Sequence, residues 1–213
     1  IDGLHLVLTY EKGLLQLGAT RGDGKVGENV TTNVKTIESI PLKLREALDV
    51  IVEGEVWLGR EQLSRLNKER ELKGESVFAN PRNAAAGTLR QLDPKIVAER
   101  KLDTFIYDLS KGEVPSNQVE ELNYLAKLGF KVNKHYQVCE TIDEVIAYWQ
   151  KWQKEKDSQD YWIDGVVVKV NSRQDQEKLG YTGKGPRFAI AFKFPAEQVT
   201  TIVEDIVLQV GRQ

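Results

Sequence analysis

The chain has 213 residues, of which 40% are hydrophobic and 29% are charged, and its formal net charge is -2. A chain of this length and balance can bury a sizeable core, and its charge excludes a protein that is basic over its whole surface. No apolar run approaches the ~20 residues that span a bilayer, and no signal peptide is recognisable, so we expect a cytoplasmic protein without membrane contact. One cysteine and two histidines exclude a disulfide framework and a Cys/His zinc cluster.

Positive charge is concentrated in two segments. Residues 60–101 carry a net charge of +4 and residues 165–213 carry +2, whereas the rest of the chain is acidic. If the chain binds nucleic acid, the contact should be local and should involve these two segments. Solvated helix faces of mixed charge explain the same counts, and charge alone favours that simpler explanation.

The first half of the chain alternates predicted strands and helices. Alternating apolar residues predict strands over 4–10 and 14–20, joined as a hairpin, and a third strand over 50–59. Leucines at helical spacing predict a helix over 60–72. An early proline followed by strong helix formers predicts another helix over 81–93.

The middle of the chain continues this pattern. We expect a strand over 103–109 and a helix over 118–129, with Gly129 suited to the helix C-terminus. Thr141 and Glu144 have the spacing of a capping box at the start of a further helix. That helix carries one apolar stripe, which we expect to be buried: Ile142, Val145, Ile146, Trp149 and Trp152.

Three more strands are predicted near the end of the chain, over 165–170, 188–194 and 201–210. The complete set of elements predicts an α+β fold with mixed, mostly antiparallel sheets and flanking helices.

The predicted strands carry charged side chains at alternating positions. In the strand 188–194, Lys193 shares a face with Ala189 and Ala191, so it should stand over a floor of small residues while the bulky side chains pack in the core. In the strand 50–59, Glu53 and Glu55 lie together on one face. A single charge in an apolar strand is most often solvated or paired, but the recurrence in several strands favours a site.

An Ile-Asp-Gly triplet precedes an apolar run twice, at Asp2 and at Asp164, and the second run ends with Lys169. Chance repetition of three residues explains this as well. Carboxylates and lysines that converge on a sheet cleft are nevertheless what nucleotidyl transfer requires, because cations and a carboxylate-held Mg²⁺ neutralise charge on the phosphate. No Walker-type phosphate loop is present in the sequence.

The string FANPRNAAAGTLRQLD, at residues 78–93, is long and specific. It resembles the corresponding segment of the nucleotidyltransferase domain of bacterial NAD-dependent DNA ligases. The strings TRGDG, GEVWL, WIDGVVVKV and GPRFAIAFKFPAE follow that family's order, so the resemblance covers essentially all 213 residues. It implies the nucleotidyltransferase core of covalent ligases, which is ATP-grasp-like, over 1–200. Residues 201–213 would be a final strand that leads toward an oligonucleotide-binding domain.

The resemblance also implies roles for individual residues. Asp2 and Asp164 would order the nucleophile and the cleft, and Lys169 and Lys193 would hold the α-phosphate. Glu55 would face the ribose and a metal ion, for which Mg²⁺ is expected.

Three arginines and one tyrosine complete the implied set. Arg21 would contact the nucleotide, and Tyr107 would stack on adenine. Arg82 and Arg90 would contact the adenylate or the phosphate at the nick. Eight residues advance a helix by about two turns, so this last pair should lie on nearly one face.

The function implied is the sealing of nicks in duplex DNA, through a lysyl-AMP and then a DNA-adenylate, with NAD as the AMP donor. We expect a monomer that binds NAD, AMP and nicked double-stranded DNA. The family's nucleophilic lysine directly precedes the first triplet, and in this sequence no residue stands before Ile1. Two alternatives stay open: an adenine-nucleotide-binding fragment without catalysis, and an ATP-dependent nucleotidyltransferase relative, against which the string at 78–93 speaks.

Overall fold

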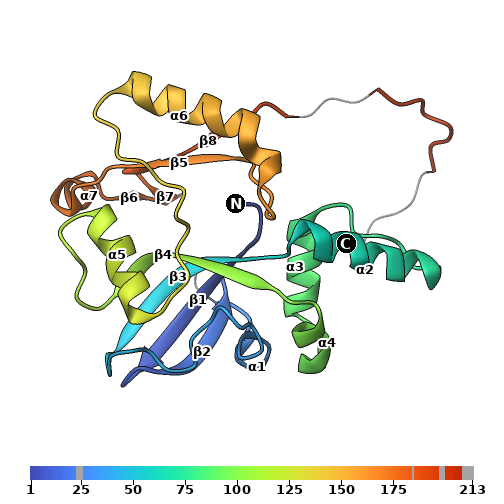
Figure 1. The fold of residues 1–213 in the computed structure, drawn as a ribbon, viewed down its shortest axis with the longest axis horizontal. Helices are drawn as coiled ribbons and strands as arrows, with labels where there is room; N and C mark the ends of the chain where they lie inside the picture. Colours follow the sequence, from blue (N-terminus) through green and yellow to red (C-terminus); the bar gives the residue numbers. More distant parts are fainter. Residues whose placement is uncertain (23–25, 184, 197–199, 208–213) are drawn as a thin grey trace.

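The apolar alternation near the start of the chain produces the predicted hairpin, which consists of β1 (Leu4–Glu11) and β2 (Leu14–Thr20). β1 also pairs with β3 (Val50–Trp57), which pairs with β4 (Asp103–Lys111), so a four-stranded antiparallel sheet forms in the order β2-β1-β3-β4 (Figure 1). The structure is a computed structural model that describes residues 1–22, 26–183, 185–196 and 200–207.

One face of this sheet builds the main hydrophobic core. Leu6, Leu8 and Tyr10 of β1 are at most 1% exposed. The helices α1 (Thr31–Val34), α3 (Pro81–Leu89) and α5 (Gln118–Leu128) contribute the buried side chains that pack against this face. Because successive side chains of a strand point to opposite faces, the polar residues of β1 and β3 are left on the other face of the sheet.

A second, smaller sheet lies opposite that polar face. It consists of β5 (Gly165–Lys169) and β8 (Ala189–Lys193), which pair antiparallel. Figure 1 shows these strands between α6 (Ile142–Glu155) and the four-stranded sheet, with the N-terminus of the chain also between the sheets. The indole nitrogen of Trp149 in α6 donates to the carbonyl of Phe192, 3.1 Å away, and the two rings stack at 4.8 Å.

The second sheet is attached to the first at one end by the segments around α5 and α7 (Arg173–Leu179). The backbone nitrogen of Gln118 donates to the carbonyl of Asn171 at 2.9 Å, and the nitrogen of Arg173 donates to the carbonyl of Ser116 at 2.9 Å. These backbone bonds fix the exit of β5 against the end of β4.

An aromatic cluster attaches the other end. Tyr161, which precedes β5, packs at 5.2 Å from both Trp57 of β3 and Phe105 of β4. The residue after Tyr161 adds a backbone contact: the nitrogen of Asp2 donates to the carbonyl of Trp162 at 2.9 Å. The second sheet is therefore held at both ends, and its separation from the first sheet is set by the fold.

Most predicted elements are confirmed within one or two residues. These are the strands at the positions of β1 to β5 and β8, the helix α2 (Arg60–Leu72) and the helix α5. Gly129 ends α5 as predicted, and its backbone is left-handed, with a φ of 110°. Thr141 accepts from the nitrogen of Glu144, as predicted, although the Glu144 carboxylate accepts from the nitrogen of Glu140.

The predicted helix over 81–93 is wrong in its extent. α3 ends at Leu89, and a separate helix, α4 (Pro94–Glu99), follows. The residues predicted to end the first helix instead begin the second: the side chain of Asp93 accepts from the nitrogen of Lys95 at 2.9 Å and so caps α4, and Pro94 suits its first helical position. α1, α4, α7, the short strands β6 (Tyr181–Thr182) and β7 (Gly185–Pro186) and a 3-10 turn at Lys156–Ser158 were not predicted.

The prediction of a buried apolar stripe on α6 is also wrong in part. Trp152 is 5% exposed, but Ile142 is 69% exposed and Ile146 is 38% exposed. Ile190 on β8, which was expected to pack in the core, is 68% exposed. A sheet of two strands is only ~5 Å wide between strand axes, so it cannot cover the whole stripe of α6.

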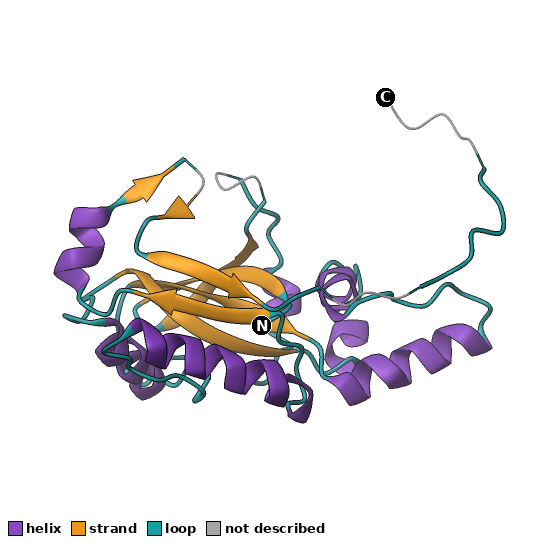
Figure 2. Ribbon diagram, turned by 90° about the horizontal axis from the view of Figure 1, so that it is seen from above, coloured by secondary structure: helices purple, strands orange, loops and turns teal. Residues whose placement is uncertain are grey.

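The strand predicted over 201–210 is absent from residues 201–207, the part of it that the structure describes. Figure 2 shows these residues as a loop apart from both sheets, and Ile202, Val203, Ile206 and Val207 are exposed. An apolar alternation forms a stable strand only when a neighbouring strand is present to pair with it. Residues 208–210 lie outside the described residues. No helix in the described part of the chain is long and apolar enough to cross a membrane.

The attachment at α5 gives a test of stability. Glu121 is 1% exposed and accepts from the nitrogen of Leu109 at 2.8 Å, and burial raises the pKa of its carboxyl group. Glu121→Leu should lower the free energy of unfolding by about 1–3 kcal/mol, because the buried nitrogen loses its acceptor. Glu121→Gln, which keeps an acceptor without the charge, should retain the stability of the unmodified protein in urea denaturation. An equal loss in both variants would show that the charge opposite Arg173 matters more than the hydrogen bond.

Candidate functional site

The register of the second sheet places two lysines on one face. Lys193 pairs with Gly165, and Lys169 pairs with Ala189, four positions along each strand. Ala191 lies between these pairs, so the predicted floor of small residues is confirmed. Lys193 is 61% exposed, which leaves its ammonium group available to a ligand.

The first sheet presents an aromatic ring and carboxylates toward these lysines. The ammonium nitrogen of Lys169 lies 5.6 Å from the centre of the Tyr107 ring and 3.6 Å from the Oδ1 atom of Asp108. On β3, Glu55 lies directly across from His5 of β1. We call the place where the two sheets meet the inter-sheet site, defined by Asp2, Glu55, Tyr107, Asp164, Lys169 and Lys193.

The two Ile-Asp-Gly triplets lie side by side at this site. The backbone bond from Asp2 to Trp162 brings the first triplet against the residue that precedes the second. Lys193 donates a hydrogen bond to Asp164, and the nitrogen of Ile1 lies 4.0 Å from the Oδ1 atom of Asp164. The repetition thus has a structural meaning, because both triplets deliver a carboxylate to the same place.

The glycines of the triplets are required by close strand contacts. A Cβ atom at Gly3 would lie 2.3 Å from the carbonyl oxygen of Val56. A Cβ atom at Gly165 would lie 2.6 Å from the carbonyl oxygen of Phe192. Both distances are too short for any side chain, so each aspartate is followed by the residue that lets a neighbouring strand approach.

Burial raises the pKa of Asp2 and of Glu55, and the nearby charge of Asp164 raises the pKa of Asp2 further. For Asp164 itself, burial alone would raise the pKa, but the hydrogen bond from Lys193 contributes most to a net lowering. The site therefore holds two carboxylates whose ionised forms are disfavoured, beside one whose charge is compensated. A bound cation would relieve this unfavourable charge.

The three predicted arginines lie at different distances from this centre. The charge of Arg82 on α3 lowers the pKa of both Asp2 and Glu55, so this side chain lies near the site. The charge of Arg21 lowers the pKa of Tyr107, so this arginine also lies near the site. Arg90 is the C-cap residue just beyond α3 and forms an ion pair of 2.5 Å with Glu28. Arg82 thus lies in the first turn of α3, and Arg90 at its C-terminal end is already paired with a carboxylate.

Asp108 and His5 lie beside residues of the inter-sheet site, at 3.6 Å from Lys169 and 6.4 Å from the Tyr107 ring, and were not predicted. Asp108 follows Tyr107 directly, and in a regular strand it would point to the opposite face. A register shift in the β3–β4 pairing, between Glu53 and Gly54, brings Asp108 opposite Glu53. The identity of the strand partner and the position of this bulge have no local signal in the sequence.

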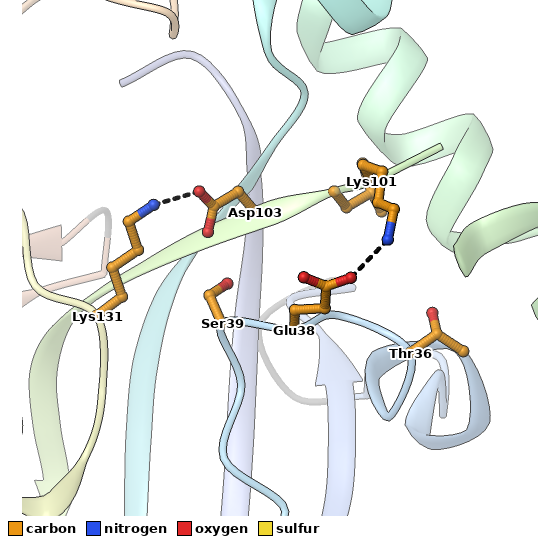
Figure 3. Close-up of a pocket in the computed structure, with 7 residues that line it drawn as sticks. Thr36, Glu38, Ser39, Lys101, Asp103 and Lys131 are labelled. Carbon is orange, nitrogen blue, oxygen red and sulfur yellow. Dashed lines mark hydrogen bonds and ion pairs between the residues drawn. The ribbon is translucent and has the colours of Figure 1, made fainter. Parts of the chain in front are cut away.

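Two surface pockets lie outside the inter-sheet site. One, of about 360 Å³, is lined by Thr36, Glu38, Ser39, Lys101, Leu102, Asp103 and Lys131. Figure 3 shows that Lys131 pairs with Asp103 and Lys101 pairs with Glu38, so both cations are already compensated. The other, of about 500 Å³, lies between α2 and α4. Neither contains a predicted site residue, and no cluster of three metal-binding side chains occurs in the described residues.

The raised pKa of Glu55 predicts a pH-dependent effect on stability. A carboxyl group whose pKa is higher in the folded state destabilises the fold once it ionises, and this cost is absent below its unfolded pKa of ~4.3. Glu55→Gln should therefore raise the thermal midpoint at pH 8, and the gain should shrink as the pH falls toward 4. Glu113→Gln, which changes an exposed carboxylate, is the matched control and should give no such trend. A gain for Glu55→Gln that is independent of pH would contradict this electrostatic account.

Comparison with known proteins agrees with the resemblance found in the sequence. Residues 1–197 match the family model described as NAD-dependent DNA ligase adenylation domain. The chain is 54% identical over 214 residues to a DNA ligase of Thermotoga neapolitana, in an alignment that covers 100% of the chain and 31% of that protein.

Two further relatives give the same result. The chain is 53% identical over 215 residues to a DNA ligase of Carboxydothermus hydrogenoformans, with 100% of the chain and 32% of the relative covered. It is 52% identical over 214 residues to a DNA ligase of Bacillus cytotoxicus, again with 100% and 32% covered. The chain thus spans about a third of the length of the curated relatives it matches.

Proposed function

The chain belongs to the family of NAD-dependent DNA ligase adenylation domains, and from that premise we propose that its inter-sheet site binds NAD and transfers the AMP half. In the intact protein, this transfer is the first step of sealing a nick in duplex DNA. The observation that carries the proposal is the position of Lys169, which extends from the second sheet over the ring of Tyr107 in the first, at 5.6 Å. The arrangement combines a stacking surface with a fixed cation.

Different residues of the site are proposed to bind the adenine base and the α-phosphate. Tyr107 offers its ring to adenine, and Lys169 and Lys193 neutralise the charge that develops on the α-phosphate. Fixed cations stabilise such a transition state because they need no reorganisation when the charge appears. The small side chains of Ala189 and Ala191 leave room beside Lys193 for the phosphate. This division is the one expected of the nucleotidyltransferase core of covalent ligases.

The carboxylates fit a magnesium ion. Mg²⁺ is commonly held by one or two carboxylates together with substrate phosphates, and the pKa values of Asp2 and Glu55 are raised by burial at this place. We propose that Glu55 holds the ion, with Asp2 beside it. When bound, Mg²⁺ would supply positive charge to the phosphate oxygens.

The nucleophile and the DNA complete the proposal. The nitrogen of Ile1 lies 4.0 Å from Asp164, so the residue that precedes Ile1 in the intact protein would enter the site beside Lys193. A lysine there would attack the α-phosphate of NAD, release nicotinamide mononucleotide and form a lysyl-AMP. The 5′-phosphate at the nick would then accept AMP, and the 3′-hydroxyl would displace it. Arg82 and Arg90, both exposed, would contact the adenylate or the nick phosphate.

A labelling experiment tests the proposed transfer. The intact protein is incubated with NAD labelled in the adenylate phosphate and is separated under denaturing conditions. We expect a labelled band, and no band from a polypeptide that begins at Ile1. Labelling by ATP but not by NAD would favour the ATP-dependent relative, and nucleotide binding without any covalent label would favour a non-catalytic binding domain.

Replacement of Lys193 by alanine in the intact protein tests the role of the cation. The rate of nucleotidyl transfer should fall at least ~100-fold, because the lost contact acts on the transition state. The thermal midpoint should stay nearly unchanged, since the side chain is 61% exposed. Lys178→Ala is the matched control, because Lys178 is also exposed and paired, 3.1 Å from Asp175, but lies outside the site. Normal transfer with lost thermal stability would show that Lys193 is structural.

A further inference from the structure

The side chain of His5 is fixed against β3 by one strong contact. Its Nε2 atom lies 3.0 Å from the Oε2 atom of Glu53. The partner is a carboxylate, which can only accept, so Nε2 is the donor. The other ring nitrogen, Nδ1, is buried and has no hydrogen-bond partner among the described residues. The ring is therefore committed to Glu53 as its one polar contact.

The contact with Glu53 continues along the sheet toward the second sheet. The hydroxyl group of Ser110 can donate to the Oε1 atom of Glu53 or to the Oδ2 atom of Asp108, which lies 3.3 Å from its Oγ atom, so the two carboxylates share one proton. The Oδ1 atom of Asp108 lies 3.6 Å from the ammonium nitrogen of Lys169. A chain of polar contacts thus links His5 to the lysine at the inter-sheet site.

This series of polar contacts, from His5 to Lys169, passes around the ring of Tyr107. The His5 ring is 6.4 Å from the Tyr107 ring at one end, and the Lys169 nitrogen is 5.6 Å from it at the other. The Tyr107 ring thus has a neighbour from each end of this series of contacts, His5 at one end and Lys169 at the other.

We propose that His5 is a positioning residue for nucleotide binding, which acts through Glu53, Ser110 and Asp108 to hold Lys169 over Tyr107. The inference rests on the proposed function, since it concerns the affinity of the site for the AMP half of NAD. None of the sequence patterns or family strings includes this histidine among the functional residues.

The effect of His5 depends on the negative charge of Glu53. The hydrogen bond from His5 is the largest of the effects that lower the pKa of Glu53. Without it Glu53 keeps its charge but loses a donor, so it draws the Ser110 hydroxyl group away from Asp108. Asp108, which holds Lys169 at 3.6 Å, then loses a contact that fixes it, and a shift of Asp108 moves Lys169 away from the ring. The expected effect is on binding of the nucleotide rather than on the chemical step.

The first test compares two replacements of His5 in the intact protein. His5→Leu removes the donor and should raise the KM for NAD and the Kd for AMP by about 3- to 10-fold, which corresponds to one lost hydrogen bond. The value of kcat should change less than twofold. His5→Gln, whose amide can donate to Glu53, should restore most of the affinity. Thr9→Val, on the same face of β1 but outside the polar chain, is the control and should leave both constants unchanged.

The second test is a double-mutant cycle for AMP binding. Glu53→Gln removes the charge that His5 holds, so His5→Leu should cost little additional affinity in that background. A Kd for AMP that is unchanged in His5→Leu would overturn the inference. So would equal losses of thermal stability and affinity in His5→Leu and His5→Gln, because they would indicate a purely structural role. Absence of AMP binding by the unmodified protein would overturn the proposed function itself, which separates the two failures.

Discussion

The attachment of the second sheet at both of its ends is the constraint on which the site depends. Two backbone bonds, from Gln118 to Asn171 and from Arg173 to Ser116, fix one end, and the aromatic cluster around Tyr161 fixes the other. Neither end lies in the main core, and each joins segments that are distant in sequence. Because both ends are fixed, Lys169 and Lys193 face the first sheet without being packed into it. A phosphate can therefore meet charges that are already in position, which is the condition for electrostatic catalysis.

The same constraint explains why the site lowers the stability of the folded protein. Bringing the sheets together buries Asp2 and Glu55 beside each other and beside Asp164, and only Asp164 gains a direct lysine partner. The core face of the first sheet, with side chains such as Leu6 and Leu8 fully buried, provides the stability that offsets this cost. Function and stability are thus assigned to opposite faces of one sheet, as the period of two along each strand requires.

The sequence predicted the parts of the molecule that depend on local patterns. Strand alternation correctly placed Lys193 over Ala189 and Ala191, and the conformation of Gly129 followed from its position after a helix. Predictions failed where the burial of a side chain depends on the size of the neighbouring element. Ile142 is exposed because the sheet beside α6 is narrow, which no local pattern reports.

The contribution of Asp108 depends on a bulge, and that of His5 on a carboxylate 48 residues away. The charged strand residues of the site followed from alternation along the strands, whereas their roles, and the inclusion of Tyr107 and the arginines, came from a resemblance over long strings. The structure brings Asp2, Glu55, Tyr107, Asp164, Lys169 and Lys193 together at one place, while Arg90 engages Glu28 instead.

The contact of Trp149 with β8 has a practical consequence. Its indole nitrogen lies 3.1 Å from the carbonyl of Phe192 and 3.3 Å from that of Lys193, and its ring stacks on Phe192. The chromophore is thus bonded to the backbone of the residue proposed to bind phosphate, on the face of β8 opposite the lysine. Any displacement of that strand changes the polarity around the indole, so the protein carries an optical reporter of its own ligand site. Trp149 is one of four tryptophans in the sequence, so its emission follows events at the site in a variant that keeps Trp149 alone.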